Sequence, residues 1–187
     1  MDYEISNKFQ SNLSGNEAIL WTGHPKRGLM LRGSDAFMIP FSILWGGFAI
    51  FWEYTAYTSG APKFFLVIGG AFVLMGLYLI FGRFIFDALK RNKTYYAVTN
   101  ERVIILSEFF ANKTQSLNLK TLSEISLSEK SNGSGTITFG QQNPFSSWMT
   151  GMHWPGMGQN QAPMFELSEE VANVYNIIRD AQKRIER

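Results

Sequence analysis

"TYYAVTNERVIIL", residues 94–106, is the stretch that decides the fold of the second half of this chain. Two runs rich in aromatic and β-branched residues, Thr94–Val98 and Arg102–Leu106, flank the polar segment Thr99–Glu101. Residues of these types favour strands, and a short polar connection between two such runs favours a hairpin. The stretch therefore predicts the first hairpin of an antiparallel sheet.

Three later runs alternate polar and apolar side chains, at residues 113–122, 124–130 and 136–140. In the second run, Ile125 and Leu127 are expected to point inward. Turn-forming clusters such as SNGSG separate the runs at intervals of about ten residues. This spacing predicts an antiparallel sheet that curls into a sandwich or barrel.

A helix is predicted at the C-terminal end, from about Glu169 to Glu186, with Ser168 as its N-cap. Acidic residues fill its first turn, where the helix dipole favours them. An apolar stripe at helical spacing runs along the helix, and we expect this stripe to cover one open end of the sheet. The stripe consists of Val171, Val174, Ile178, Ala181 and Ile185.

Residues 1–35 form an N-terminal segment that is expected to contribute one strand, Ala18–Thr22, to the same sheet. Before that strand, Ile5, Phe9 and Leu13 recur at helical spacing and predict a short helix. The apolar region that follows would then be inserted near the start of the strand-rich domain.

Two uncharged apolar segments, Ala36–Trp52 and Phe64–Phe81, precede the hairpin sequence, and Glu53 ends the first of them. At about 1.5 Å per residue, each is about 26 Å long, close to the hydrocarbon thickness of a bilayer. We predict a transmembrane helical hairpin over residues 36–89, with spans at about 36–52 and 64–86. The alternative is two buried helices of a soluble core, which the lack of a polar face disfavours.

The charges that flank the two spans predict their orientation. Cations precede the first span and follow the second, whereas the connecting segment carries only Lys63. The positive-inside rule therefore places both termini in the cytoplasm. Glycines in both spans, including Gly46 and Gly76, would let the two helices, or a partner helix, approach closely. The flanking cations are Lys26, Arg27 and Arg32 on one side, and Arg83, Lys90, Arg91 and Lys93 on the other.

Several stretches of the chain resemble the bacterial pleckstrin-homology (PH) family, especially its membrane-flanked members. They are AILWTGHP before the first span, TYYAVTNERVIIL after the second, LKTLSEISL, GTITFG and the final VANVYNIIRDAQ. The resemblance covers most of the chain from Glu17 onward, and it implies a cytoplasmic PH-like domain at residues 90–187. That domain is a curled antiparallel sheet or barrel of seven strands, capped by a C-terminal helix at 169–186. Together with the two spans, this predicts an α+β membrane protein of the bacterial cytoplasmic (inner) membrane.

The same resemblance bears on ligands. Phosphoinositide-binding relatives carry a basic cluster across the first two strands and the loop between them. Here that loop is Thr99-Asn100-Glu101-Arg102, with an acid beside the arginine and no second basic partner. We therefore do not expect specific recognition of inositol phosphates.

The composition argues against several classes of function. The 187 residues include no cysteine, which excludes disulfides, thiolate nucleophiles and cysteine-ligated metals. The net charge of +2 is too small to argue for nucleic-acid binding. His24 and His153 lack partners at metal-ligand spacing, and no nucleotide-binding or nucleophile motif is present. We expect no catalytic residue, no metal and no cofactor, with an enzyme of unrecognised site kept as an alternative.

Four basic residues after the uncharged segment Phe64–Phe81 are predicted membrane or headgroup contacts: Arg83, Lys90, Arg91 and Lys93. Cations beside a span gain about 1 kcal/mol each from anionic headgroups. The alternative is that they only fix topology as stop-transfer charges, which we take as their main role. Asp87 within the group weakens a headgroup site.

Residues 141–164 form a long predicted loop, rich in Trp, Met, Gly and Pro. Long loops in compact domains are uncommon and often functional, and exposed Trp and Met suit adaptable contact surfaces. We predict that this loop docks on the membrane interface or on a partner protein. The alternative is that its aromatic residues fold back into the core. The predicted contact residues are Trp148, Met149, Met152, Trp154 and Met157.

The sequence as a whole predicts a non-catalytic, membrane-anchored scaffold or accessory subunit. Its predicted partners are the lipid bilayer and either a membrane protein complex or further copies of itself. The alternative function is a module that binds a lipid headgroup or a peptide in membrane sensing or stress response.

Overall fold

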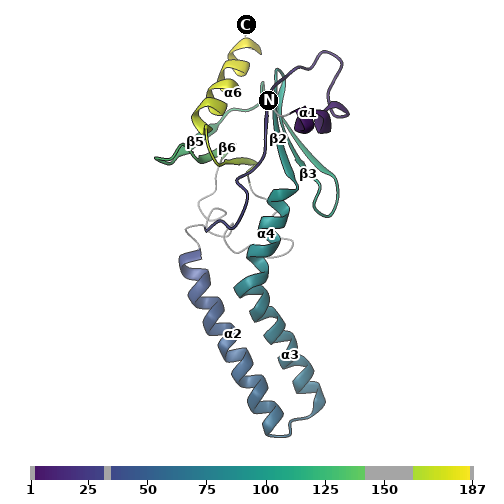
Figure 1. The fold of residues 1–187 in the computed structure, drawn as a ribbon, viewed down its shortest axis with the longest axis vertical. Coiled ribbons are helices and arrows are strands. Elements are labelled where there is room, and N and C mark those ends of the chain that lie inside the picture. Colours follow the sequence, from purple (N-terminus) through teal and green to yellow (C-terminus); the bar gives the residue numbers. More distant parts are fainter. Residues whose placement is uncertain (1–2, 32–34, 142–161, 186–187) are drawn as a thin grey trace. The chain divides into compact units, whose positions relative to one another are not determined.

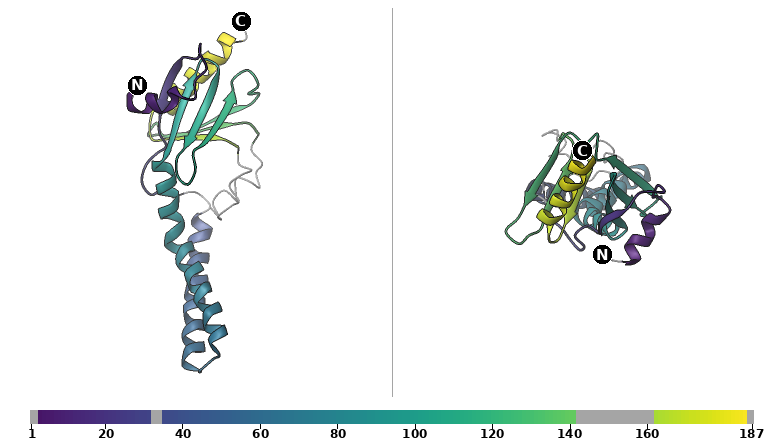
Figure 2. Two further views of the ribbon diagram at one scale, coloured as in Figure 1. Left: turned by 90° about the vertical axis from the view of Figure 1, so that its right-hand side faces the viewer. Right: turned by 90° about the horizontal axis from the view of Figure 1, so that it is seen from above.

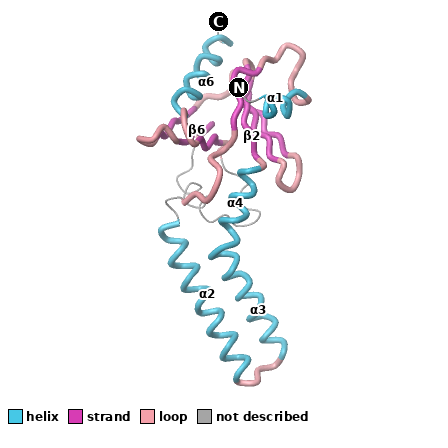
Figure 3. Tube along the Cα trace, viewed as in Figure 1, coloured by secondary structure: helices cyan, strands magenta, loops and turns pink. Residues whose placement is uncertain are grey.

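The computed structural model describes residues 3–31, 35–141 and 162–185, which fall into two compact units. We call residues 29–31 and 35–87 the helical hairpin. Residues 3–28, 88–141 and 162–185 form the body. The hairpin is helical, whereas the strands of the described residues all lie in the body (Figure 3).

Two long helices run side by side in the helical hairpin (Figure 1). The first, α2, spans Asp35–Thr58. The second begins as α3, Lys63–Leu77, and continues through a π-helical turn, Tyr78–Gly82, into α4, Arg83–Asn92. By length and composition, both helices are long and apolar enough to cross a membrane.

Both helices extend beyond the predicted spans. α2 passes through Glu53, where the sequence predicted the end of the span, and continues to Thr58. The hydroxyl groups of Thr55 and Thr58 donate hydrogen bonds to carbonyl oxygens one turn back, at 2.8 and 3.0 Å, so the helix itself satisfies these polar groups. Gly60, with a φ of +68°, then follows in a left-handed conformation that glycine adopts without strain. α4 likewise continues past the predicted end of the second span.

Glycines bring the two helices close together. A Cβ atom added to Gly76 would lie 2.8 Å from the Cα atom of Gly46, and one added to Gly46 would lie 2.9 Å from Cδ1 of Ile80. A larger residue at either position would push the helices apart, as predicted for these glycines. Elsewhere, large apolar side chains are more than half exposed, among them Phe48, Phe51, Leu74 and Phe81.

The stretch TYYAVTNERVIIL, residues 94–106, forms the predicted pair of strands in the body. β2, Thr94–Thr99, pairs antiparallel with β3, Arg102–Ser107. β1, Ile19–Gly23, pairs with β2, and β4, Lys113–Asn118, pairs with β3, giving a sheet in the order β1-β2-β3-β4. Because β1 precedes the helical hairpin and β2 follows it, the hairpin is inserted between two neighbouring strands of one sheet.

A second antiparallel sheet has the order β5-β6-β7. Its strands are β5, Ile125–Glu129, β6, Gly135–Phe139, and β7, Met164–Leu167. β7 begins at the last residue of the predicted loop and was not predicted from the sequence. Leu127 shares a face with the buried Ile137 but is 36% exposed, because β5 lies at the edge of this sheet.

The central strands β2 and β3 are covered on both faces, which explains why their sequence is apolar at consecutive positions. One face joins the main core of the body through Tyr96, Val98, Val103 and Ile105. The opposite face packs against α1, Tyr3–Gln10, which contributes the buried residues Ile5 and Phe9. Its sheet residues are Ala97, Ile104 and Leu106.

The C-terminal helix α6, Val171–Ile185, packs on the strands of the body (Figure 2). Four of the five residues of its predicted apolar stripe are buried, with Val171, Val174, Ile178 and Ala181 at most 2% exposed. The fifth, Ile185, is part-buried against the same core. Gln182 ties the helix to the segment after β4 by donating to the carbonyl oxygens of Leu119 and Leu122, both at 3.0 Å.

The start of α6 differs from the prediction. The N-cap position belongs to Glu170, whose carbonyl oxygen accepts from the Val174 N–H at 3.1 Å, and the predicted cap Ser168 lies outside the helix. The Val171 N–H donates to the carbonyl oxygen of Gly133 at 3.2 Å. That bond to the β5–β6 turn fixes where the helix begins, and Glu170 takes a positive φ of +53° there.

Candidate functional site

The turn between β2 and β3 is held by a part-buried ion pair. Arg102 donates from Nε to Oε1 of Glu17 at 2.8 Å and from Nη2 to Oε2 at 2.7 Å. The Thr99 hydroxyl also donates to Oε1, at 2.7 Å. The Glu17 side chain is fully buried, whereas that of Arg102 is 26% exposed. The contact therefore joins the N-terminal segment to the β2–β3 strand pair.

The ion pair also fixes the charge state of its carboxylate. Hydrogen bonds from Arg102 hold the pKa of the Glu17 carboxyl at about 2, and bonds from the Ser14 N–H and the Thr99 hydroxyl act in the same direction against the effect of burial. The bidentate contact uses the Nε and Nη2 donors of Arg102. Its remaining nitrogen, Nη1, donates to the Ser116 hydroxyl at 3.1 Å. The arginine of the turn is thus a structural group and is not displayed for a headgroup.

Two of the four predicted membrane contacts are buried. Arg83 lies at the start of α4, where its Nη1 is 3.0 Å from Oδ1 of Asp35 and both side chains are less than a tenth exposed. In the body, Arg91 donates to the carbonyl oxygens of Lys26 and Gly28 at 3.2 and 2.9 Å. These two guanidinium groups bind within the chain.

The other two predicted contacts, Lys90 and Lys93, have exposed side chains near the end of α4. The structure therefore does not bring the four cations together as one exposed cluster. The predicted contact residues Trp148, Met149, Met152, Trp154 and Met157 lie outside the described residues.

The turn between β3 and β4 carries an aromatic pair that was not predicted from the sequence, with Phe110 exposed and Phe109 half-buried. We call residues 108–112 the tip. Phe110 is 85% exposed, and its ring centroid lies 4.3 Å from that of Phe109. The signal in the sequence is the run EFFANK, in which two adjacent aromatic residues sit in a polar connection between two strands. Such exposure is unusual, because a turn gains no stability from apolar side chains in water.

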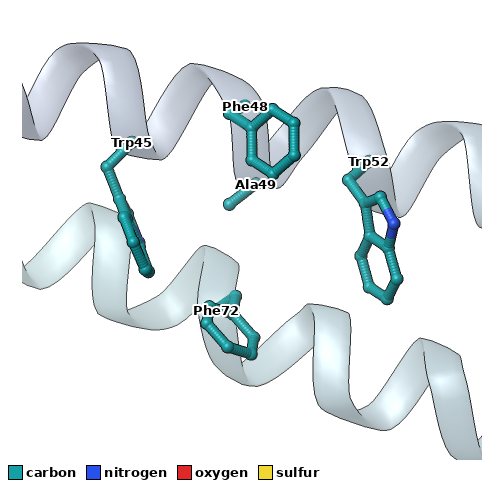
Figure 4. A pocket seen from close by; sticks show the side chains of 5 residues that line it. All are labelled: Trp45, Phe48, Ala49, Trp52 and Phe72. Atoms are coloured by element: carbon teal, nitrogen blue, oxygen red, sulfur yellow. The ribbon is translucent and has the colours of Figure 1, made fainter.

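Two apolar hollows lie on the helical hairpin. The larger, of about 430 Å³, is lined by α2 and α3 residues that include Trp45, Ala71 and Met75. The smaller, of about 230 Å³, lies between Trp45 and Trp52 of α2 and Phe72 of α3 (Figure 4). Their linings are almost wholly carbon, so they suit apolar chains or side chains and offer no groups for acid–base chemistry.

A third hollow, of about 210 Å³, lies in the body and is partly polar. Thr22 and His24 from β1 and the segment after it line it, together with Glu169 and Glu170 before α6. The imidazole Nδ1 of His24 lies 3.0 Å from the carbonyl oxygen of Pro25. Within the part of the chain that the structure describes, no group of three His, Asp or Glu residues is arranged to hold a metal ion.

Searches of protein-family models and of curated proteins find no match to this chain. Among solved structures, the chain is similar to a DUF1696 family protein with a pleckstrin-homology domain from Shewanella loihica PV-4. The two are 12% identical, the match covers 48% of this chain and 70% of the other, and the TM-score is 0.33. A TM-score of 0.33 is too low to assign a fold, so the fold is assigned from the chain's own topology. That topology comprises antiparallel strands in two sheets followed by a C-terminal helix, an arrangement consistent with a PH-like body.

Proposed function

We propose that this chain is a non-catalytic, membrane-anchored scaffold or accessory subunit of the bacterial cytoplasmic membrane. The observation that carries the proposal is the outward-facing apolar surface of the helical hairpin. In the most apolar 18-residue windows of the two helices, only 28% and 17% of the residues are buried. A core helix of a soluble protein would be mostly buried, whereas a bilayer covers such a surface favourably.

The flanking charges support a body on the cytoplasmic side of the membrane. Arg27, before the first helix, and Lys90 and Lys93, at the end of the second, are exposed or part-exposed cations. The segment between the helices contributes only Lys63. The positive-inside rule therefore supports a PH-like body in the cytoplasm.

A scaffold or accessory role is supported by the two hollows of the helical hairpin. Ala71 lines the larger hollow together with the aromatic residues Trp45 and Phe72. Small residues next to large ones allow another helix to pack closely, and such packing drives helix association in a bilayer. The partner in this proposal is a helix of another membrane protein or of a second copy of this chain.

Filling the larger hollow is expected to release that partner. In Ala71→Trp, an indole would occupy the space of about 430 Å³ that we assign to the partner helix. Native mass spectrometry of the full chain, extracted in mild detergent, should show an oligomer or a complex of fixed composition for the unsubstituted chain. The Ala71→Trp variant should be detected as a monomer without a bound partner.

Leu77→Trp is the matched control, because Leu77 is 44% exposed on α3 but does not line the hollow. It should leave the assembly intact. A bare monomer from the unsubstituted chain, or equal disruption by both variants, would contradict a scaffold that assembles through this hollow.

A further inference from the structure

We infer that the tip, residues 108–112, is a membrane-insertion element that places Phe109 and Phe110 in the headgroup region of the cytoplasmic leaflet. The inference rests on the proposed membrane anchor and adds a second, peripheral contact made by the body itself. The tip contacts the lipids of the same membrane that holds the helical hairpin.

The position of the tip within the body carries the inference. In the β2–β3 ladder Thr94 pairs with Ser107, and in the β3–β4 ladder Ser107 pairs with Lys113. The tip thus lies at the end of the sheet where the chain leaves α4. The Glu108 N–H donates to the carbonyl oxygen of Lys93 at 2.8 Å, which joins the tip to the residue directly after that helix.

Chain continuity keeps this end of the sheet near the bilayer. α4 ends at Asn92, and Phe86 and Leu89 in its last turns are 44% and 47% exposed. At about 1.5 Å per residue, the helix rises about 6 Å between Leu89 and the first residue beyond its end. With Leu89 assigned to the edge of the hydrocarbon core, Lys93 lies within a headgroup layer, which measures about 5–8 Å on each side of that core. The bond from Glu108 then keeps the base of the tip at that level.

Charge favours the same placement. Lys90, Lys93 and Lys113 are exposed cations at this end of the sheet. The acid of the tip, Glu108, is neutralised by Lys8, whose Nζ lies 2.8 Å from its Oε2. Anionic headgroups attract such a group of lysines, and aromatic rings favour the membrane–water interface. Insertion thus removes the exposed ring of Phe110 from water without burying an unpaired acid.

The body does not need the tip for its own core. Phe110 is 85% exposed, and neither ring belongs to the two clusters of buried side chains in the body. Substitutions at the exposed positions 110 and 111 should leave the fold intact, so an altered membrane contact can be measured directly.

The absence of cysteine allows a sharp test with single spin labels on the full chain, reconstituted in vesicles that contain anionic phospholipid. Ala111→Cys places the label inside the tip and keeps both phenylalanines. Ser131→Cys, in the exposed β5–β6 turn, is the matched control. The quantity measured is the accessibility of the nitroxide to oxygen divided by its accessibility to a water-soluble nickel chelate.

We expect this ratio to be at least fivefold higher at position 111 than at position 131. Adding Phe110→Ser to the labelled Ala111→Cys chain should lower the ratio to within twofold of the control. Equal ratios at the two positions would overturn the inference. A label at position 111 that is shielded from both reagents would overturn it too, because a protein contact would then cover the tip.

A third label separates this inference from the proposed anchor. Leu74→Cys reports on α3, where Leu74 is 68% exposed. If position 74 is in lipid while position 111 is in water, the anchor stands and the tip inference fails. If position 74 is also in water, both fail.

Discussion

Replacing Arg102 with alanine is expected to lower the free energy of unfolding of the body by about 3–5 kcal/mol. The substitution leaves the fully buried Glu17 carboxylate without its cation, at the point where the N-terminal segment meets the β2–β3 turn. Breaking a buried ion pair costs more than the pair contributes, because the remaining charge stays desolvated. Hydrogen exchange of the β2 and β3 amides in the full chain measures the change.

The same ion pair predicts that the stability of the body falls at low pH. The pKa of Glu17 is about 2 in the folded body, against an ordinary value of 4.5. A lowered folded-state pKa contributes stability that is present above the unfolded value and is lost as pH falls through the folded one. The body should therefore lose on the order of 3 kcal/mol between about pH 5 and pH 2 through this group. Arg102→Ala should flatten that dependence.

Lys183→Ala is the control for the ion pair. Its amine lies 3.8 Å from Asp180, and both side chains are about two-thirds exposed. Exposed pairs of this kind contribute little, so no measurable loss is expected. If Arg102→Ala costs less than about 1 kcal/mol, or if the acid dependence survives it, the pair does not hold the turn as described.

The second large effect is expected for Phe165→Ala, which should cost the body about 3–5 kcal/mol. Phe165 in β7 is fully buried, and its ring stacks on Tyr96 at 4.2 Å between centroids and meets Phe139 at 5.1 Å. It therefore joins the second sheet to the first, and truncation would leave a cavity between the two sheets. The measurement is the same hydrogen-exchange experiment, read at the β2 and β6 amides.

Phe110→Ala is the matched control, because it removes the same ring from a site that is 85% exposed. In detergent it should change the free energy of unfolding by less than about 0.5 kcal/mol. A loss from Phe165→Ala no larger than that of the control would mean that the two sheets do not share one core.

Local pattern was enough to predict the helical hairpin, the β2–β3 hairpin and the buried stripe of α6. Each depends on the spacing of apolar residues along one element, and a single sequence contains that information. The consecutive apolar residues in RVIIL result from the burial of β3 on both faces, which was not predicted. Only the position of α1 against Ile104 and Leu106 explains that run.

What the sequence did not predict depends on contacts between distant residues. Glu17 and Arg102 are 85 positions apart, so nothing local marks them as a pair. Arg83 and Arg91 were predicted as surface cations from their place after a span, but tertiary contacts bury both. α6 begins at Val171, and Ser168 is not its N-cap, because the hydrogen bond from the Val171 N–H to Gly133 outweighs the local capping preference.

The tip was missed for a different reason. The long segment at 141–164 carries more aromatic residues and was predicted as the contact surface, whereas the two phenylalanines lie in a short turn. Their exposure depends on where the turn lies at the end of the sheet, which no periodicity reveals. The contacts of Ser107, Lys113 and Lys93 make the position clear.

The central claim, that the helical hairpin crosses the cytoplasmic membrane and leaves the body in the cytoplasm, is tested most directly by thiol labelling of intact cells. The chain has no cysteine, so Ser59→Cys between the helices and Ser131→Cys in the body are unique targets for a membrane-impermeant maleimide. Ser59→Cys should react in intact cells, and Ser131→Cys should react only after the membrane is opened. Labelling of Ser131→Cys from outside, or failure of Ser59→Cys to react until the cells are opened, would contradict this topology.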